Sequence, residues 1–210
     1  MTTPAAEPLG PLDPSRTALV LIDLQRGIVG MPSVPIAAPE VVAGAVRLAR
    51  ACREAGMLVV LVRVTPSPDR RDALRPPADA AVQGQASPPA DWAEIVPELG
   101  PEPGDLLITK RQWGAFYGTE LDLQLRRRGV DTIILGGIST DIGVESTARD
   151  AYERGYAQVF ALGAMAARSA AGHAHAVDEI MPRMGRVRTV DEIVEAVRRG
   201  SGPAGSPDRG

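Results

Sequence analysis

The sequence predicts a three-layer α/β domain of the Rossmann-like type, with a mostly parallel sheet of about six strands. Two observations support this fold class. Short apolar runs alternate along the chain with segments whose apolar residues recur at helical spacing. The hydrophobic content is 44% but the aromatic content is only 3%, so the core must be built mainly from aliphatic side chains. Strands that alternate with helices form parallel sheets with both faces covered.

The apolar runs give six expected strands and the periodic segments give five expected helices. The strands are expected at residues 17–24, 58–65, 105–110, 132–138, 158–163 and 186–189, and the last is a short edge strand. The helices are expected at residues 40–55, 119–128, 140–154, 170–180 and 190–199. Thr119 should cap the second helix, with Asp122 three residues later as in a capping box.

A long segment, residues 66–104, separates the second strand from the third and is rich in Pro, Ala and Asp. A loop of that length inside a domain is usually functional or partly helical, and residues 91–96 are expected to supply a short helix. We find no internal repeat. Residues 1–199 are therefore expected to form a single domain, and residues 200–210 a disordered tail.

Composition and charge exclude several classes of function. The formal charge is -3, and the only basic block is Arg126–Arg128, so nucleic acid is not an expected partner. No apolar run approaches the roughly 20 residues that a membrane span needs, and the N-terminus lacks a signal-peptide pattern. The single cysteine cannot form an internal disulfide. We therefore expect a cytoplasmic protein with no membrane association.

Lys110 is the only lysine among 23 Lys and Arg residues. The chain uses arginine wherever a generic cation will do, so a single lysine suggests a site that needs a compact ammonium rather than a planar guanidinium. The alternative is chance under a codon usage that favours arginine.

Several polar residues follow the ends of expected strands. The first strand ends in Asp23, with Gln25 just after it, and the third ends in Lys110. The fourth strand runs into Ser139 and Thr140, which open a helix. Ligands of open parallel sheets bind beyond the carboxyl ends of the strands, so we expect these residues to lie near one site.

Asp23 is the odd member of an otherwise apolar strand, ALVLIDL. A carboxylate there is costly unless it is paired or hydrogen-bonded. The functional interpretation is an acid/base group held by Lys110, whose ammonium would lower the carboxyl pKa while burial would raise it. The alternative is a cap or turn residue just past the strand.

Gly143 falls near the first turn of the helix that follows the fourth strand. Glycine costs about 1 kcal/mol relative to alanine inside a helix, and close approach of a ligand to the backbone would explain it. The helix start also offers backbone N–H groups, including those of Ser139 and Gly143, to a developing negative charge. Simple tolerance of glycine near a helix end is the alternative.

Three of the seven aromatic residues, Trp113, Phe116 and Tyr117, follow Lys110 closely in KRQWGAFYGT. A loop rich in rings at the mouth of a site suggests the wall of a flat or apolar substrate pocket. An interface between subunits is the alternative, and both roles are compatible.

Other candidates carry weaker signals. Cys52 lies in helical register with apolar residues and is expected to be an inert core residue. His173 and His175 have no Cys or carboxylate cluster beside them, so no metal site is expected. Gly136–Gly137 lacks the spacing of a phosphate-binding loop, and we expect no cofactor.

At three places the sequence resembles the isochorismatase-like, or cysteine hydrolase, superfamily. The segments are ALVLIDLQ, then ITKRQWGAFYGTELDLQLRRRGVDTIILGGISTDIGVESTARDAYERGY, then PRMGRVRTVDEIVEAV, and the likeness covers residues 17–197. The resemblance implies an isochorismatase-type fold, a catalytic role for Asp23 and Lys110, a homo-dimer or homo-tetramer, and a non-proline cis peptide near Ile138–Ser139.

The chain departs from this resemblance at one position. The superfamily usually has a nucleophilic cysteine where this chain has Gly143, which cannot form a covalent thioester. Isochorismatases proper also resemble the pattern with glycine there, and they hydrolyse a vinyl ether with the Asp as general acid. The central motif looks closer to a bacterial branch with GVESTAR after its own glycine. The Asp–His–His metal cluster of nicotinamidases is missing.

These observations predict a hydrolase of a small metabolite that uses Asp23 and Lys110 and attack by water, without a cysteine nucleophile. The substrate is a cyclic vinyl ether such as isochorismate, or an amide-like compound. Two alternatives remain. A degenerate family member would bind a small molecule or a partner without turnover, although the intact pair argues against it. An aminohydrolase that uses Cys52 would require a different position for the first helix.

Overall fold

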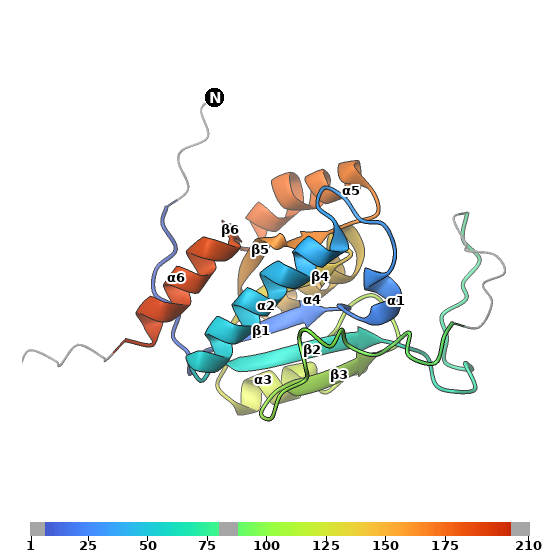
Figure 1. The fold of residues 1–210 in the computed structure, drawn as a ribbon, viewed down its shortest axis with the longest axis horizontal. Helices are drawn as coiled ribbons and strands as arrows, with labels where there is room; N and C mark the ends of the chain where they lie inside the picture. Colours follow the sequence, from blue (N-terminus) through green and yellow to red (C-terminus); the bar gives the residue numbers. More distant parts are fainter. Residues whose placement is uncertain (1–6, 80–87, 203–210) are drawn as a thin grey trace, which may run out of the picture.

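The computed structural model describes residues 7–79 and 88–202 (Figure 1). Six strands form one sheet, and every neighbouring pair is parallel, in the order β3-β2-β1-β4-β5-β6. Their bounds are β1 (Thr17–Ile22), β2 (Leu58–Val64), β3 (Leu106–Lys110), β4 (Thr132–Ile138), β5 (Ala157–Ala166) and β6 (Arg186–Thr189). The predicted α/β class with a parallel six-stranded sheet is confirmed.

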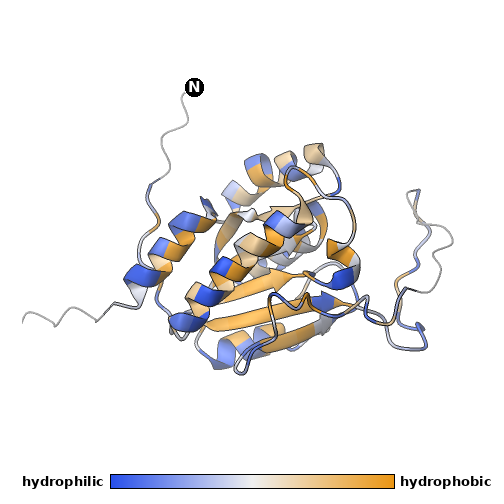
Figure 2. Ribbon diagram, viewed as in Figure 1, coloured by the Kyte–Doolittle hydropathy of each residue, from blue (hydrophilic) through white to orange (hydrophobic). Residues whose placement is uncertain are grey.

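Helices cover both faces of the sheet (Figure 1). The longer ones are α2 (Ala38–Glu54), α3 (Leu121–Arg127), α4 (Glu145–Glu153) and α6 (Val190–Gly200). Shorter turns are α1 (Arg26–Val29), η1 (Thr140–Val144), α5 (Ala170–His175), η2 (Ala176–Ile180) and η3 (Met181–Arg183). α2 and α6 pack on one face, and α3 and α4 on the other. The central strands β2, β1 and β4 between them are mostly apolar (Figure 2).

Several local predictions were wrong. Residues 91–96 form turns rather than a short helix. Thr119 does not head a capping box, because α3 begins at Leu121 with no side-chain cap, and Asp122 instead accepts a hydrogen bond from the Tyr156 hydroxyl at 2.8 Å. At the C-terminus, α6 runs through Gly200, the first residue of the expected tail; residues 203–210 lie outside the described part of the chain.

The order of the strands creates a topological switch point between β1 and β4. The chain adds β2 and β3 on one side of β1, and then adds β4, β5 and β6 on the other side. The two strands approach closely at Gly137, where φ is +129° and a Cβ atom would lie 2.0 Å from the carbonyl oxygen of Ile22. Only glycine fits there. Because β1 and β4 are parallel neighbours, the residues that follow both strands lie at the same edge of the sheet.

No helix among the described residues is long and apolar enough to cross a membrane.

Candidate active site

A buried ion pair lies at the carboxyl edge of the sheet. Nζ of Lys110, the last residue of β3, is 2.7 Å from Oδ2 of Asp23, which directly follows β1. The side chains are 1% and 7% exposed, respectively. Asp23 has a left-handed backbone conformation with φ of +55°, and its N–H donates to the carbonyl of Val62 at 2.8 Å. Aspartate tolerates this conformation better than most residues.

The ammonium of Lys110 has three hydrogen-bond acceptors. Besides Asp23, Nζ donates to the backbone carbonyls of Trp113 at 2.9 Å and Gln112 at 3.2 Å. An ammonium carries three protons and no lone pair, so this arrangement satisfies it completely.

The carboxyl group of Asp23 is asymmetric. Oδ2 accepts from Lys110, whereas Oδ1 is buried and has no hydrogen-bond partner within the described residues. Burial raises the pKa of Asp23 to about 6, against the opposing effect of the nearby Lys110 ammonium. Because Lys110 needs Oδ2 as an acceptor, a proton bound to Asp23 belongs on Oδ1.

Gly143 lies directly beside this pair, in η1. A Cβ atom on Gly143 would be 3.3 Å from Oδ2 of Asp23 and 3.0 Å from Cγ2 of Ile22. η1 follows the peptide bond Ile138–Ser139, which is cis as the resemblance implied. The backbone of η1 thus forms one wall of the site. At Gly143, where this backbone comes nearest to Asp23, there is no side chain.

A cavity of about 240 Å³ opens next to the pair. It is lined by Asp23, Ile28, Met31, Val64, Trp92, Lys110, Gln112, Trp113, Ile138, Ser139, Ile142, Gly143 and Arg168. Most of these side chains are apolar, and two are tryptophans. The cavity is smaller than the range of about 300–1,000 Å³ typical of ligand pockets, so it suits a small metabolite.

The structure brings five of the predicted site residues to this cavity: Asp23, Lys110, Trp113, Ser139 and Gly143. Trp113 is 65% exposed and stands at the rim. The hydroxyl of Ser139 donates to Asp141 at 2.6 Å.

Two of the predicted polar residues, Gln25 and Thr140, do not line the cavity. The buried amide of Gln25 accepts from the N–H of Val64 at 2.8 Å and donates to the carbonyls of Val64 and Trp92. It therefore fixes the loop that carries Trp92 against the end of β2. Thr140 is fully buried, and its hydroxyl lies 2.9 Å from Nδ1 of His173. Both residues support the site rather than line it.

Phe116 and Tyr117 also lie away from the cavity. Phe116 is 4% exposed and packs in the core against Tyr156, with 5.6 Å between ring centroids. Tyr117 is 75% exposed and points to solvent. The three rings of this loop therefore have different surroundings, because Trp113 lines the cavity, Phe116 lies in the core and Tyr117 lies in solvent.

Sequence reasoning missed part of the cavity wall. Trp92 comes from the long segment 66–104, and its indole packs on Gly27, where a Cβ atom would lie 1.9 Å from the ring. Arg168 follows β5, and Ile28 and Met31 come from the turn after β1. Three rings close together make the loop KRQWGAFYGT recognisable in the sequence. Trp92 is a single aromatic residue in its segment and therefore gives no comparable signal.

The remaining candidates contribute no reactive group. Cys52 is fully buried on α2, and burial raises the pKa of its thiol to about 12. Burial also lowers the pKa of His173, while Asp141 and Asp178 act in the opposite direction. Within residues 7–79 and 88–202, no group of three His, Cys, Asp or Glu side chains is arranged to hold a metal ion.

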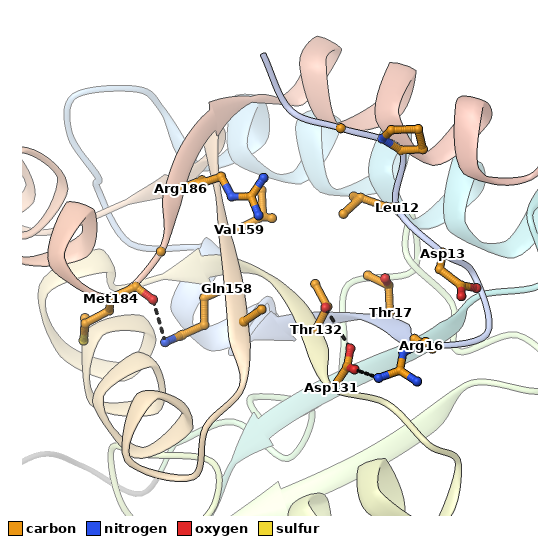
Figure 3. Close-up of a pocket in the computed structure, with 14 residues that line it drawn as sticks. Leu12, Asp13, Arg16, Thr17, Asp131, Thr132, Gln158, Val159, Met184 and Arg186 are labelled. Atoms are coloured by element: carbon orange, nitrogen blue, oxygen red, sulfur yellow. Dashed lines mark hydrogen bonds and ion pairs between the residues drawn. The ribbon is translucent and has the colours of Figure 1, made fainter. Parts of the chain in front are cut away.

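A second hollow, of about 430 Å³, lies at the opposite edge of the sheet, where β1, β4 and β5 begin (Figure 3). Arg16 pairs there with Asp131, which also accepts from the Thr132 hydroxyl at 3.0 Å. The two charged side chains are 60% and 39% exposed. This is a solvated groove whose charges neutralise each other, and it lacks a buried ion pair like the one at the carboxyl edge.

Comparisons with known proteins show the family of this chain. The model of the isochorismatase domain family matches residues 17–192. An uncharacterised isochorismatase family protein of Bacillus subtilis is 48% identical over 188 residues, which cover 89% of this chain and 97% of that protein. The ureidoacrylate amidohydrolase RutB of Rhizobium rhizogenes is 32% identical over 178 residues, 74% of this chain and 72% of that one.

A solved structure is also similar. The isochorismatase family protein of Burkholderia thailandensis has a TM-score of 0.85 and 42% identity, with 90% of this chain and 98% of that chain covered.

Proposed function

This chain belongs to the isochorismatase family of hydrolases, and from that premise we propose that it hydrolyses a small metabolite with Asp23 as the proton-transferring group. One observation carries the proposal. The Asp23 carboxyl has one oxygen held by Lys110 and a second, buried oxygen with no partner among the described residues, at the wall of an apolar cavity. A carboxyl group in that state is prepared to exchange a proton with a bound molecule.

In the proposed reaction, Asp23 begins protonated on Oδ1 and gives this proton to the substrate. For a vinyl ether, water then adds to the ether carbon of the protonated substrate, and the Asp23 carboxylate takes a proton from that water. The resulting hemiketal collapses: its C–O ether bond breaks, the hydroxyl proton passes to the leaving oxygen, and the products are a ketone and an alcohol. Lys110 keeps its hydrogen bond to Oδ2 of Asp23 and stabilises the carboxylate that forms in the first step. For the amide alternative, backbone N–H groups of Ser139 and Gly143 are proposed to bind the negative charge that develops on the carbonyl oxygen when water adds.

We propose that no covalent intermediate forms, and that the chain belongs to a branch of the family with glycine at the nucleophile position. Gly143 has no side chain to attack with, and Cys52 is buried in α2 with a raised pKa. A vinyl ether such as isochorismate suits acid-assisted cleavage with water attack. The likeness to an amidohydrolase favours a second candidate, an amide or ureide, for which Asp23 would act as the base that activates water.

The competing class is a family member that binds a small molecule without turnover. To decide, purified protein is screened against isochorismate, its amino analogue and a panel of small amides and ureides. The Asp23→Asn variant is measured in parallel. Turnover by the wild type that is lost in Asp23→Asn supports the proposal. Binding of a panel member without turnover supports the competing class, and turnover that survives in Asp23→Asn rejects the assigned mechanism.

A further inference from the structure

Thr147 is a fully buried polar residue of α4, and it has no role in the reaction described above. We propose that Thr147 is a positioning residue, whose hydroxyl holds the loop that contacts Lys110 against the turn that contains Gly143. The proposal deepens the proposed function, because it concerns the same acid–base pair. It rests on the proposed function for its effect on turnover, whereas its geometric part is testable without a substrate.

The hydroxyl of Thr147 forms two hydrogen bonds whose directions are fixed by their partners. It accepts from the backbone N–H of Ala115 at 3.1 Å and donates to the carbonyl of Gly143 at 2.7 Å. An N–H can only donate and a carbonyl can only accept, so the hydroxyl proton points at Gly143. A threonine inside a helix often donates to the carbonyl four residues earlier, and that bond alone would carry no inference. The bond from Ala115 joins two distant parts of the chain.

The bond from Ala115 anchors the loop that follows β3. Two residues before Ala115, the carbonyl of Trp113 accepts from Nζ of Lys110 at 2.9 Å. Gly114 lies between them and packs directly on α4, because a Cβ atom there would lie 3.6 Å from the carbonyl oxygen of Ser146. The backbone that supplies an acceptor to Lys110 is therefore held close to the first turns of α4.

The bond to Gly143 leads back to the other member of the pair. A Cβ atom on Gly143 would lie 3.3 Å from Oδ2 of Asp23 and 3.6 Å from the carbonyl oxygen of Trp113. Both of these oxygens accept from Nζ of Lys110. The contacts close a ring, whose members are Asp23, Lys110, Trp113, Ala115, Thr147 and Gly143.

The ring depends on the Thr147 hydroxyl. Within the part of the chain that the structure describes, no other hydrogen bond joins residues 111–119 to η1 or α4. Ala115 is fully buried, so without the hydroxyl its N–H would be left unpaired inside the protein, which is costly. The loop would move to find another partner. Because Trp113 is only two residues away, that movement would displace the carbonyl that accepts from Lys110.

The competing explanation is that Thr147 only stabilises the fold. A purely structural role would lower the melting temperature and leave the surroundings of Lys110 unchanged in the folded protein. Lys110 is the only lysine of the chain, so a protein with isotope-labelled lysine gives one set of lysine side-chain NMR signals. These signals report directly on the ion pair and separate the two explanations.

The experiment compares the wild type with Thr147→Val, Thr147→Ser and Thr17→Val, each carrying isotope-labelled lysine. Valine keeps the shape of threonine and removes the hydroxyl, whereas serine keeps the hydroxyl. Thr17 is the matched control, because it is also buried but lies at the opposite edge of the sheet, where β1 begins. We would record the Nζ and Cε chemical shifts, the exchange of the Nζ protons with water, and kcat and KM with the substrate found in the screen.

We expect Thr147→Val to shift the lysine signals and to speed the exchange of the Nζ protons about tenfold, because the loop that covers them opens more often. Its kcat should fall about 10- to 100-fold with little change in KM, since a misplacement of about 1 Å in a reacting group costs on the order of 100-fold. Thr147→Ser should stay close to the wild type, and Thr17→Val should match it.

The pH profile gives a further readout that a purely structural role would not move. The ammonium of Lys110 lowers the pKa of Asp23, against the larger effect of burial. If Lys110 is held less well, it lowers that pKa less. The inflection of kcat/KM in Thr147→Val should therefore move to higher pH than in the wild type.

Three results would overturn the inference. The first is a folded Thr147→Val whose lysine signals match the wild type. The second is an equally large change in Thr147→Ser, which would assign the effect to packing. The third is a wild type whose Nζ protons exchange as fast as those of an exposed lysine, which decides the question even if Thr147→Val does not fold.

These three results do not involve turnover, so they leave the Asp23 mechanism standing. Changed lysine signals in a Thr147→Val enzyme with wild-type kcat would also overturn the positioning role, because the place of Lys110 would then not matter to the reaction. Conversely, lysine signals that depend on the Thr147 hydroxyl in a protein without hydrolytic activity would support the geometric part and reject the proposed function.

Discussion

Lys110 contacts Asp23 through Oδ2 alone, at 2.7 Å, and leaves Oδ1 buried without a partner among the described residues. The two oxygens of one carboxyl group thus have separate tasks. Oδ2 anchors the group to the ammonium, and Oδ1 is available to a molecule in the cavity. This division decides what each substitution at the pair should do.

Replacing Asp23 with Asn keeps the size of the side chain and removes the transferable proton. We expect kcat to fall about 100- to 10,000-fold, the usual contribution of a general acid or base. Asp178→Asn, at an exposed position on η2, is the control and should keep wild-type activity. Steady-state kinetics with the substrate found in the screen would check this, and an active Asp23→Asn enzyme would contradict the proposed role.

The pH dependence of kcat/KM should report the raised pKa of Asp23, about 6. A general acid must be protonated in the free enzyme, so kcat/KM should be flat at low pH and fall about tenfold per unit above pH 6. An increase in kcat/KM through the same pH range would mean instead that Asp23 acts as a base, as expected for amide cleavage. A profile without any inflection near pH 6 would remove Asp23 from the chemistry.

The same raised pKa has a consequence for stability. Native Asp23 holds its proton up to about pH 6, whereas its ordinary pKa is 3.8. Its contribution to the free energy of unfolding is therefore fully present below about pH 4 and is lost as the pH rises through about 6. Denaturant unfolding of the wild type and Asp23→Asn should show the wild type losing stability relative to the variant between pH 4 and 7. A constant difference would argue against the raised pKa.

Lys110→Arg should abolish activity although it keeps the positive charge. Nζ has acceptors at 2.7, 2.9 and 3.2 Å in a site that is 1% exposed, and a larger planar guanidinium cannot meet all three in that space. Overpacking should also lower the free energy of unfolding by about 1–3 kcal/mol. Kinetics and thermal unfolding would be measured together. A folded variant with most of its kcat would show that any cation suffices.

The pairing of Asp23 with Lys110 was predictable from sequence because both residues are exceptions to a pattern. Asp23 interrupts an apolar strand, Lys110 is the only lysine, and both stand at strand ends, which a parallel sheet collects at one edge. Arg168 carries no such signal, because it is one of many arginines and its place depends on an irregular strand pairing within the sheet.

The direction of a side chain in a loop was not predictable. Phe116 and Tyr117 are neighbours of Trp113 in sequence, yet Phe116 turns inward onto Tyr156 and only Trp113 reaches the cavity. Gln25 likewise follows a strand end as a site residue would, but its amide satisfies backbone groups of Val64 and Trp92. Composition identifies the loop, whereas tertiary contacts decide which of its side chains face the ligand.

Catalysis should need no thiol. Cys52 is the only cysteine, it is fully buried on α2, and burial raises the pKa of its thiol to about 12, so it should not react with iodoacetamide in the folded protein. Cys52→Ala should keep kcat and cost about 1–2 kcal/mol of stability from the lost buried sulfur. Mass spectrometry during turnover should find no covalent adduct on the protein.

Gly143→Cys tests whether a thiol placed at the superfamily's usual nucleophile position would help catalysis. Its Cβ atom would lie 3.0 Å from Cγ2 of Ile22 and 3.3 Å from Oδ2 of Asp23, which is tighter than ordinary contact. The new side chain would crowd the oxygen that Lys110 holds and would occupy the wall that the substrate needs. We therefore expect lower turnover of the true substrate, not higher. Faster turnover in Gly143→Cys, an adduct on Cys52, or an inactive but folded Cys52→Ala would revive a thiol mechanism.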